Sequence, residues 1–529
     1  MKLRPKALPL VAAAALASSL LIPGHAAGAT GYDPTDPTQK AEHDAAYATG
    51  VDAYKFGLPL LDMDRLFRTY RSVNVCNEVT GYGPVNTFCH GRRLVGAQFR
   101  DVVAPNSDTN YSIATLNLPA DGQPMVLSIP QTPDHYHVFE LLDMWTTNFA
   151  NIGDAIAKAY PDPTARPFAH PDGDYIVVGP GQLDGKLDGV TTYRGLPVIH
   201  ADTNDVWVIG RTILKSPDDL PFVHALQDSY HVIPLNKYGK DWTPKAPSKI
   251  DDKVDTATIP GTKPGEDPIA YFDALGDQLA RYAPYAADAP MLDRLHRFGI
   301  GVGLHPSATE DAATLAGLRD AVTAGPASVD ADVRAMAAAG FSAHNGWLAM
   351  NTGSYGTDYR FRAVTDKIGL GALDGRVATY PVAQTDRTGQ LLTATKRYVA
   401  HFAPGTFPPP ADGFWSLTMY DANMFLVDNE LDRYVLNDRS DLHVNPDGSL
   451  DLYLQATRPT DPEQVENWLP APAAGDATNP TQRFNLIMRL YSITPSRFDG
   501  VISGSGWVPP TILPCDATGH TVTGWTCAG

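Results

Sequence analysis

The sequence predicts a mainly β protein that also contains helices, with two antiparallel β-sandwich domains separated by a helical insert. Short runs of β-branched and aromatic residues, bounded by Pro, Gly and Asp, fill residues 95–215 and return from about residue 380. No long helical pattern separates the runs of the first stretch, which argues against a parallel βαβ sheet and favours sandwiches. Apolar residues spaced three and four apart predict helices within residues 44–70 and 267–348.

The chain begins with the pattern of a cleavable signal peptide. Three basic residues precede an apolar run over residues 10–22, which is too short to span a bilayer. A Pro-Gly break and the small residues Ala27 and Ala29 follow, so we place cleavage after Ala29. An uncleaved N-terminal anchor is the alternative. No later stretch is long and apolar enough for a membrane helix, so we expect a soluble, secreted protein.

The four cysteines fall into two local pairs, Cys76 with Cys89 and Cys515 with Cys527. Four cysteines allow three connectivities, and the local one is favoured because closing a short loop costs less chain entropy. In the oxidising compartment that the signal peptide predicts, we expect both pairs to form structural disulfides. The second pair would hold the C-terminal tail in place.

These patterns divide the chain into consecutive parts. After a flexible lead-in over residues 30–43, the helical pattern is interrupted at Gly57, Leu58 and Pro59, so we expect two helices with a break. The expected boundaries are a signal peptide at 1–29, a helical segment with the first disulfide loop at 30–94, a first β domain at 95–233, a linker at 234–266, a helical insert at 267–375, a second β domain at 376–513 and a disulfide-stapled tail at 514–529.

Apolar runs place individual strands within the two β domains. In the first β domain they predict strands at residues 125–129, 136–142, 175–181 and 206–211. In the second β domain they predict strands at residues 414–420, 425–427, 450–454 and 484–491.

Charge and missing motifs exclude several classes of function. The net charge of −18 becomes −21 once the three basic residues of the signal peptide are removed, which argues against nucleic acid or an anionic membrane surface as a partner. The chain contains no phosphate-binding P-loop, no His-Glu-x-x-His and no Gly-x-Ser-x-Gly. The glycine-rich run at 299–303 does not follow a clear strand, so we expect no cofactor. The sequence does not determine the oligomeric state.

Polar residues crowd the entry of one predicted strand, at Asn106, Asp108, Thr109 and Tyr111. Such side chains can form a turn that binds its own backbone, which is the structural interpretation. The functional interpretation makes Asp108 a carboxylate in a pocket, with Asn106 and Thr109 as ligand donors. Both interpretations stay open at this point.

A second carboxylate, Asp143, ends an apolar strand and precedes Trp145. Asp108 and Asp143 would suit general acid–base catalysis if their environments separate their pKa values, although sequence spacing cannot show that they meet. His135 and His137 would share one strand face. We expect no metal site there, because spacing marks no third ligand.

Two arginines in the second β domain, Arg433 and Arg489, lie near or inside apolar strands. A buried arginine needs a partner, so each is either a structural ion-pair member or an anion-binding donor. Aromatic residues around them would pack in the core or stack on a sugar or an aromatic ligand.

Several of these segments resemble a pair of domain families of unknown function, numbered 1254 and 1214, of exported bacterial type. The N-terminal resemblance rests on residues 54–59, 105–111, 136–143, 179–181 and 209–212, and the C-terminal one on 414–421, 447–449, 467–472 and 489–491. It implies two domains similar to the jelly-roll halves of peptide-N-glycosidase F, a glycan amidase. The tail from residue 514 lies beyond the family pattern.

We expect a secreted hydrolase that acts on a glycan or a small carboxylate or amide substrate, with Asp108 and Asp143 as catalytic carboxylates. The alternatives are a non-catalytic extracellular ligand-binding or envelope-assembly protein, and motifs that only fix the interface between the β domains. The candidate substrate-binding residues are Asn106, Thr109, Tyr111, Tyr136, Trp145, Arg211, Trp415, Tyr420, Arg433, Trp468 and Arg489.

Overall fold

The computed structural model describes residues 31–529 except 101–103, 119–122, 133, 162–168, 241–255, 339–344, 474–478, 480, 517–518, 522–526 and 528–529. The predicted signal peptide and its cleavage site therefore lie outside the described residues. In the part of the chain that is described, no helix combines the length and apolarity needed to cross a bilayer.

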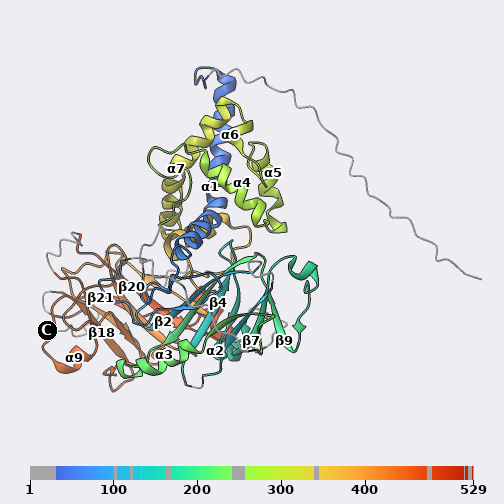
Figure 1. Ribbon diagram of the computed structural model, residues 1–529. Helices are drawn as coiled ribbons and strands as arrows, with labels where there is room; N and C mark the ends of the chain where they lie inside the picture. Colours follow the sequence, from blue (N-terminus) through green and yellow to red (C-terminus); the bar gives the residue numbers. More distant parts are fainter. Residues whose placement is uncertain are drawn as a thin grey trace, which may run out of the picture.

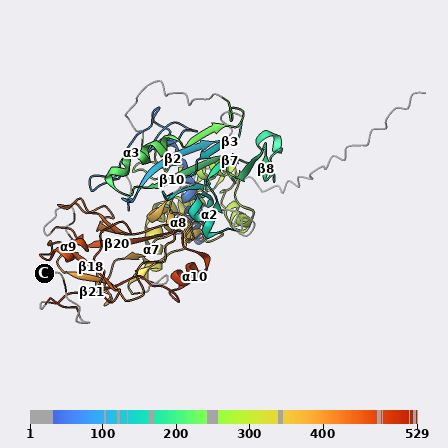
Figure 2. The same cartoon turned by 90° about the horizontal axis from the view of Figure 1, so that it is seen from below.

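A helical bundle stands on two β domains that lie side by side (Figures 1 and 2). The N-terminal helical segment and the helical insert both contribute to it, and they share one apolar core that includes Phe56, Leu60, Phe272 and Leu275. Segments about two hundred residues apart thus form one layer. The bundle contains α1 (Pro37–Tyr70), α4 (Ala270–Arg281), α5 (Ala289–His296), α6 (Pro306–Thr309), α7 (Ala312–Ala338) and α8 (Tyr359–Gly369).

Helix α1 is continuous, so the prediction of two helices with a break is wrong. It begins with Asp36 as N-cap, whose side chain accepts from the Thr38 backbone N–H, and it includes part of the expected flexible lead-in. Pro59 lies inside the helix and is buried. Gly57 allows close packing, because a Cβ there would lie 2.7 Å from a Leu275 methyl. Tertiary packing thus offsets the cost of an internal proline.

The first β domain consists of two sheets around a common apolar core, and the strands predicted for it are confirmed. Most neighbours are antiparallel, but β5–β6 and β7–β9 are parallel. The six-stranded sheet contains, in spatial order, β1 (Cys89–His90), β2 (Thr109–Asn117), β10 (Asp205–Ile213), β4 (His137–Leu142), β5 (Asn148–Ile152) and β6 (Ala169–His170). The second sheet contains β11 (His231–Pro234), β3 (Met125–Ile129), β7 (Gly173–Val178), β9 (Leu196–His200) and β8 (Thr192–Tyr193).

The second β domain repeats the two-sheet plan around its own core. The strand predicted at 425–427 is wrong, since that segment makes only an isolated bridge between Tyr420 and Leu426. The larger sheet contains β12 (Trp347–Leu348), β14 (Val382–Ala383), β20 (Phe484–Tyr491), β16 (Trp415–Asp421) and β17 (Val435–Asn437), with β13 (Ala378–Thr379) also on β20. The smaller sheet contains β19 (Trp468–Pro470), β18 (Leu450–Gln455), β15 (Tyr398–Phe402) and β21 (Thr511–Pro514).

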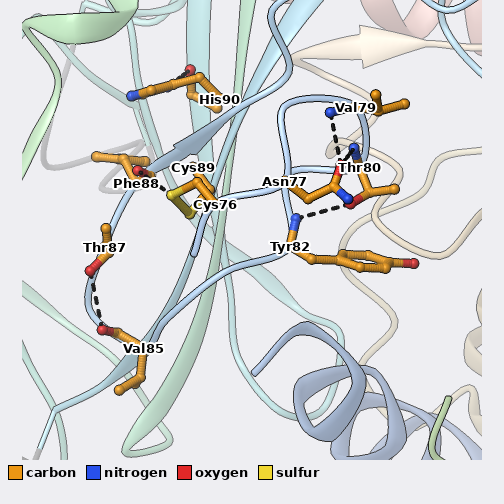
Figure 3. Close-up of a disulfide and its surroundings, with 11 residues drawn as sticks. Cys76, Asn77, Val79, Thr80, Tyr82, Val85, Thr87, Phe88, Cys89 and His90 are labelled. Carbon is orange, nitrogen blue, oxygen red and sulfur yellow. Dashed lines mark hydrogen bonds between the residues drawn. A yellow bond between two sulfur atoms is a disulfide. The ribbon is translucent and has the colours of Figure 1, made fainter. Parts of the chain in front are cut away.

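Both predicted disulfides are present, Cys76–Cys89 and Cys515–Cys527. Figure 3 shows the first one beside the short strand β1, where it closes the loop that follows α1. The Asn77 side chain accepts hydrogen bonds from the backbone of Val79 and Thr80 within this loop. The disulfide therefore joins the end of the helical segment to the edge of the six-stranded sheet.

Candidate functional site

The larger sheet of each β domain is buried on both faces. All residues of β10 and β20 are buried, as in strands that are covered from both sides. In β10, Val208 faces the sandwich core, whereas Trp207 and Ile209 pack against the helical bundle. Ile213 on the same outer face packs with Tyr491 of β20. The outer face of the first sheet is therefore covered partly by helices and partly by the second β domain.

Six polar residues occupy this covered region, and we name them the inter-domain polar cluster. Arg211 Nη1 donates to Glu140 Oε1 at 2.5 Å, and Nη2 donates to the Gly371 carbonyl at 2.8 Å. The Arg211 guanidinium lies 5.4 Å from the Tyr111 ring, which is its cross-strand neighbour. Arg211 also interacts electrostatically with two tyrosines of the second β domain. The cluster consists of Tyr111, Glu140 and Arg211 from the first β domain and Tyr380, Arg489 and Tyr491 from the second.

Arg489 is the second buried cation of the cluster. Its Nη1 donates to Thr418 Oγ1 at 2.9 Å, and its Nη2 donates to the Tyr420 hydroxyl at 2.8 Å. Nη2 also donates to the Ala104 carbonyl of the other β domain at 3.1 Å. Within the described residues, Arg489 makes no ion pair with a carboxylate, so hydroxyl and carbonyl oxygens alone receive its hydrogen bonds.

Burial and neighbouring charges shift the pKa values of the titratable groups in the inter-domain polar cluster. Burial raises the pKa of Glu140 to about 7, although the Arg211 charge opposes the shift. Burial also raises the pKa of Tyr380 to about 12. For Arg211, burial disfavours the charge, but Glu140 and the nearby tyrosines outweigh burial and raise the pKa further. Glu140 can therefore exchange a proton near neutral pH, while both arginines stay charged.

Glu140 has one free oxygen. Its side chain is fully buried, Oε1 binds Arg211, and Oε2 has no partner among the described residues. Tyr111 and Tyr380 beside it are only partly buried. A buried carboxylate oxygen without a donor is costly and calls for an explanation such as a bound water or ligand. The cluster thus contains, beside the Arg211 guanidinium, an acceptor without a partner among the described residues.

Asn106 and Asp108, two of the predicted site residues, lie at the seam between the β domains. Asp108 Oδ1 accepts from Asn437 Nδ2 and from Arg439 Nη2, both at 3.0 Å. Asn106 Nδ2 donates to the Tyr491 hydroxyl at 2.9 Å. Both side chains therefore bind the second β domain, and Asp108 is fully buried.

Family models match both β domains. A model for proteins of unknown function, DUF1254, matches residues 85–234, and a second, DUF1214, matches residues 377–495. The chain belongs to the paired DUF1254–DUF1214 family. The segment just before Asp108 in the DUF1254 domain therefore contacts the DUF1214 domain. The Pro105 carbonyl accepts from Tyr420 of β16, and the Ala104 carbonyl accepts from Arg489 of β20.

Two solved structures match the chain in the structural comparison. The VPA0106 protein from Vibrio parahaemolyticus is 20% identical with a TM-score of 0.58, and the match covers 89% of this chain and 100% of that chain. A putative uncharacterized protein from Burkholderia cenocepacia is 11% identical with a TM-score of 0.36, over 90% and 93% of the two chains. The first likeness supports the fold alone. No curated protein matches the sequence.

The Asp108 contacts lead to a stability prediction for the DUF1254–DUF1214 seam. We expect Asp108→Ala to lower the free energy of unfolding by about 1.5–3 kcal/mol, because Asn437 and Arg439 lose a charged acceptor. Urea denaturation measures the change. The control is Asp438→Ala, which removes the more exposed partner of Arg439 and should cost less than about 1 kcal/mol. Equal effects of the two variants would contradict a structural role for Asp108.

Asp143 belongs to a different cluster, beside the helical bundle. Its Oδ1 accepts from the backbone N–H groups of Trp145 at 2.9 Å and Thr147 at 3.0 Å, and its Oδ2 accepts from the Tyr285 hydroxyl. Burial raises the pKa of Asp143 to about 6, against the hydrogen bond from Tyr285. Asp108 and Asp143 share no hydrogen-bond partner among the described residues, so the structure does not bring the two predicted catalytic carboxylates together.

The remaining predicted residues have packing or hydrogen-bonding roles in the structure. Trp145 is fully buried in the core shared with the helices, and Thr109 is buried at the start of β2. Trp415 lies in the core of the DUF1214 domain, and Trp468 Nε1 donates to the Gln455 carbonyl. Among the described residues, Arg433 donates to the carbonyls of Val465 and Trp468 and to no carboxylate. Tyr420 donates to the Pro105 carbonyl, and Tyr136 packs on Phe414 and Tyr491.

His135 and His137 were predicted to share one strand face, but in the structure each histidine pairs with its own aspartate. Only His137 lies in β4, and its Nε2 is 2.8 Å from Asp172, while His135 Nε2 is 3.0 Å from Asp219. Both line a cavity of about 360 Å³ at the seam. No group of three His, Cys, Asp or Glu in the described ranges is arranged to hold a metal ion.

Sequence reasoning missed three members of the inter-domain polar cluster, Glu140, Tyr380 and Tyr491. The sequence contained a sign of Glu140, since a carboxylate inside an apolar strand needs a partner. Nothing in the sequence distinguished Tyr380 and Tyr491, because tyrosines in or next to strands are ordinary core residues.

Proposed function

We propose that the protein is an exported hydrolase that binds a glycan or a small carboxylate or amide substrate between its two β domains. Glu140 is the acid–base group in this proposal, in place of Asp108 and Asp143. The observation that carries it is the free Oε2 of a buried carboxyl whose pKa is about 7. The expected jelly-roll likeness to a glycan amidase remains part of the proposal.

The chemistry follows from the neighbours of Glu140. Ionised Glu140 takes a proton from water as the water oxygen bonds to the acyl or anomeric carbon, and it returns the proton to the leaving nitrogen or oxygen. Arg211 and Arg489 bind a negative charge on the substrate or on the developing oxyanion. The hydroxyls of Tyr111 and Tyr380, which stay partly exposed, orient the polar groups of the substrate.

Turnover of chromogenic substrates tests the proposal. The panel consists of p-nitrophenyl glycosides, p-nitrophenyl carboxylate esters and carboxylic-acid p-nitroanilides. We expect wild-type turnover of one class, with an inflection near pH 7, and a loss of at least about 100-fold in Glu140→Gln. The control is Glu430→Gln, at an exposed ion pair with Arg458. Far-ultraviolet circular dichroism spectra like that of the wild type, and cooperative melting above the assay temperature, would show that both variants fold.

Two results would overturn the assignment. Full turnover by Glu140→Gln would remove Glu140 from the chemistry. Absence of wild-type turnover on every class would exclude this hydrolase proposal and favour the second candidate, a non-catalytic ligand-binding or envelope-assembly protein. Arg489 favours that second candidate, because a buried cation without a carboxylate partner in the described residues suits binding of an anion.

A further inference from the structure

A third buried arginine, Arg362, lies in helix α8, away from the inter-domain polar cluster. Arg362 is 1% exposed, and its Nη2 donates to the Gly356 carbonyl at 2.9 Å. Nε and Nη1 are buried and have no partner among the described residues. Arginine cannot lose its proton in a protein, so this site holds a positive charge with unused donors.

Three aromatic rings surround this charge. The guanidinium carbon lies 5.7 Å from the ring centre of Tyr285 and 5.9 Å from those of Trp145 and Tyr355. We name these four residues the Arg362 cage. Cation–π attraction to the rings stabilises the charge. The rings do not, however, accept hydrogen bonds from the N–H groups at the edge of the guanidinium, as the oxygens of a carboxylate or phosphate would.

No acid of the described residues forms an ion pair with Arg362. Asp143 is close enough for the Arg362 charge to act on its pKa, but both Asp143 oxygens already accept from Trp145, Thr147 and Tyr285. The charge of Arg362 is thus attracted by Asp143, but two of its buried nitrogens have no acceptor among the described residues, and an additional anion would satisfy them.

A surface pocket lies at the beginning of the same helix. Its volume is about 420 Å³, and its lining includes Tyr359 and Arg294. Tyr359 precedes Arg362 by three residues, so both side chains project from the same face of α8. Arg294 also lies at the pocket, where its guanidinium forms an ion pair with Asp52. The net charge of −18 repels anions from the surface as a whole, so a local cationic site would select them specifically.

We propose that Arg362, which lies three residues after the pocket residue Tyr359 and does not itself line the pocket, binds the anionic group, a carboxylate or a phosphate, of a small molecule. The unused Nε–H and Nη1–H groups donate to the anion, and the aromatic rings exclude water around it. This site is separate from the proposed Glu140 chemistry, and either proposal can fail without the other.

Calorimetric titration and thermal shift with succinate and with inorganic phosphate, at constant ionic strength, test this site. We expect one of the two anions to raise the melting temperature of the wild type and to bind Arg362→Met at least ten-fold more weakly. The matched control is Arg360→Met, at an exposed position of α8 that pairs with Asp332, and it should bind like the wild type. Binding of succinate alone identifies a carboxylate ligand, and binding of phosphate alone identifies a phosphate.

The unliganded proteins provide a second readout. In buffer without either anion, Arg362→Met should melt no lower than the wild type, because the substitution removes an unpaired buried charge. Should Arg362→Met fail to fold, Arg362→Lys keeps the charge but loses the planar donors, and it should bind at least ten-fold more weakly. The proposal is overturned if the wild type binds neither anion, or if the Arg362 variant that folds binds as tightly as the wild type.

Discussion

Arg211→Met is expected to lower the free energy of unfolding by about 3–5 kcal/mol at pH 8 and by clearly less at pH 5. At pH 8 Glu140 is mostly ionised in the wild type, since its pKa is about 7. Without the Arg211 charge that lowers this pKa, the fully buried carboxylate is either unpaired or must take up a proton at pH 8. At pH 5 Glu140 holds its proton in the folded protein, so less Coulomb energy is lost. Urea denaturation at the two pH values measures the difference.

The sign of the pH dependence follows from the same pKa. Folding raises the pKa of Glu140 from 4.5 to about 7, so the folded state binds the proton more tightly than the unfolded state. The stabilisation from that proton is fully present below about pH 4.5 and is lost as the pH rises through about 7. Glu140→Gln should reduce this fall, and the double variant Arg211→Met/Glu140→Gln should recover part of the loss at pH 8. An equal loss in Arg211→Met at both pH values would contradict the ion pair.

Trp145→Ala is expected to cost about 3–5 kcal/mol of unfolding free energy, because it leaves a cavity in the apolar core. Trp145 is fully buried, its ring lies 5.2 Å from that of Phe56 in α1, and its Nε1 donates to the Ala283 carbonyl. The side chain thus joins the six-stranded sheet to the helical bundle. Denaturation followed by far-ultraviolet circular dichroism measures the loss.

Trp507→Ala is the matched control, since Trp507 is only partly buried beside the DUF1214 core. Its loss should be less than half that of Trp145→Ala, because less apolar surface becomes uncovered. If Trp145→Ala left stability unchanged and weakened only ligand binding, Trp145 would act as a stacking residue for substrate, as the sequence suggested.

The strands were predictable because their signals are local. The segments at residues 125–129 and 484–491 have the bounds expected from apolar runs between turn residues. The predicted break at Pro59 failed because propensity is a local quantity, whereas α1 is buried by helices that are distant in the sequence, α7 above all and also α4 and α8. The strand predicted at 425–427 failed because an apolar run alone does not supply a pairing partner.

The candidate site was only partly predictable. Arg211, Tyr111 and Arg489 were among the candidate substrate-binding residues, and the structure brings them into one cluster. Asp108 and Asn106 also stood out, but their hydrogen bonds show contacts across the domain seam. Glu140 was visible as a charge in an apolar strand, yet its free oxygen depends on which groups surround it in space.

The sequence by itself determined the two β domains, the helical pattern, both disulfide pairings and the family, because each depends on periodicity, short loops or linear motifs. Only the tertiary structure decided which charges meet. It separated Asp108 from Asp143, paired Arg211 with Glu140, and left Arg362 among aromatic rings without an acid partner in the described residues. The physical reason is that electrostatic energy depends on distance and burial in three dimensions, and neither quantity is contained in the spacing along the chain.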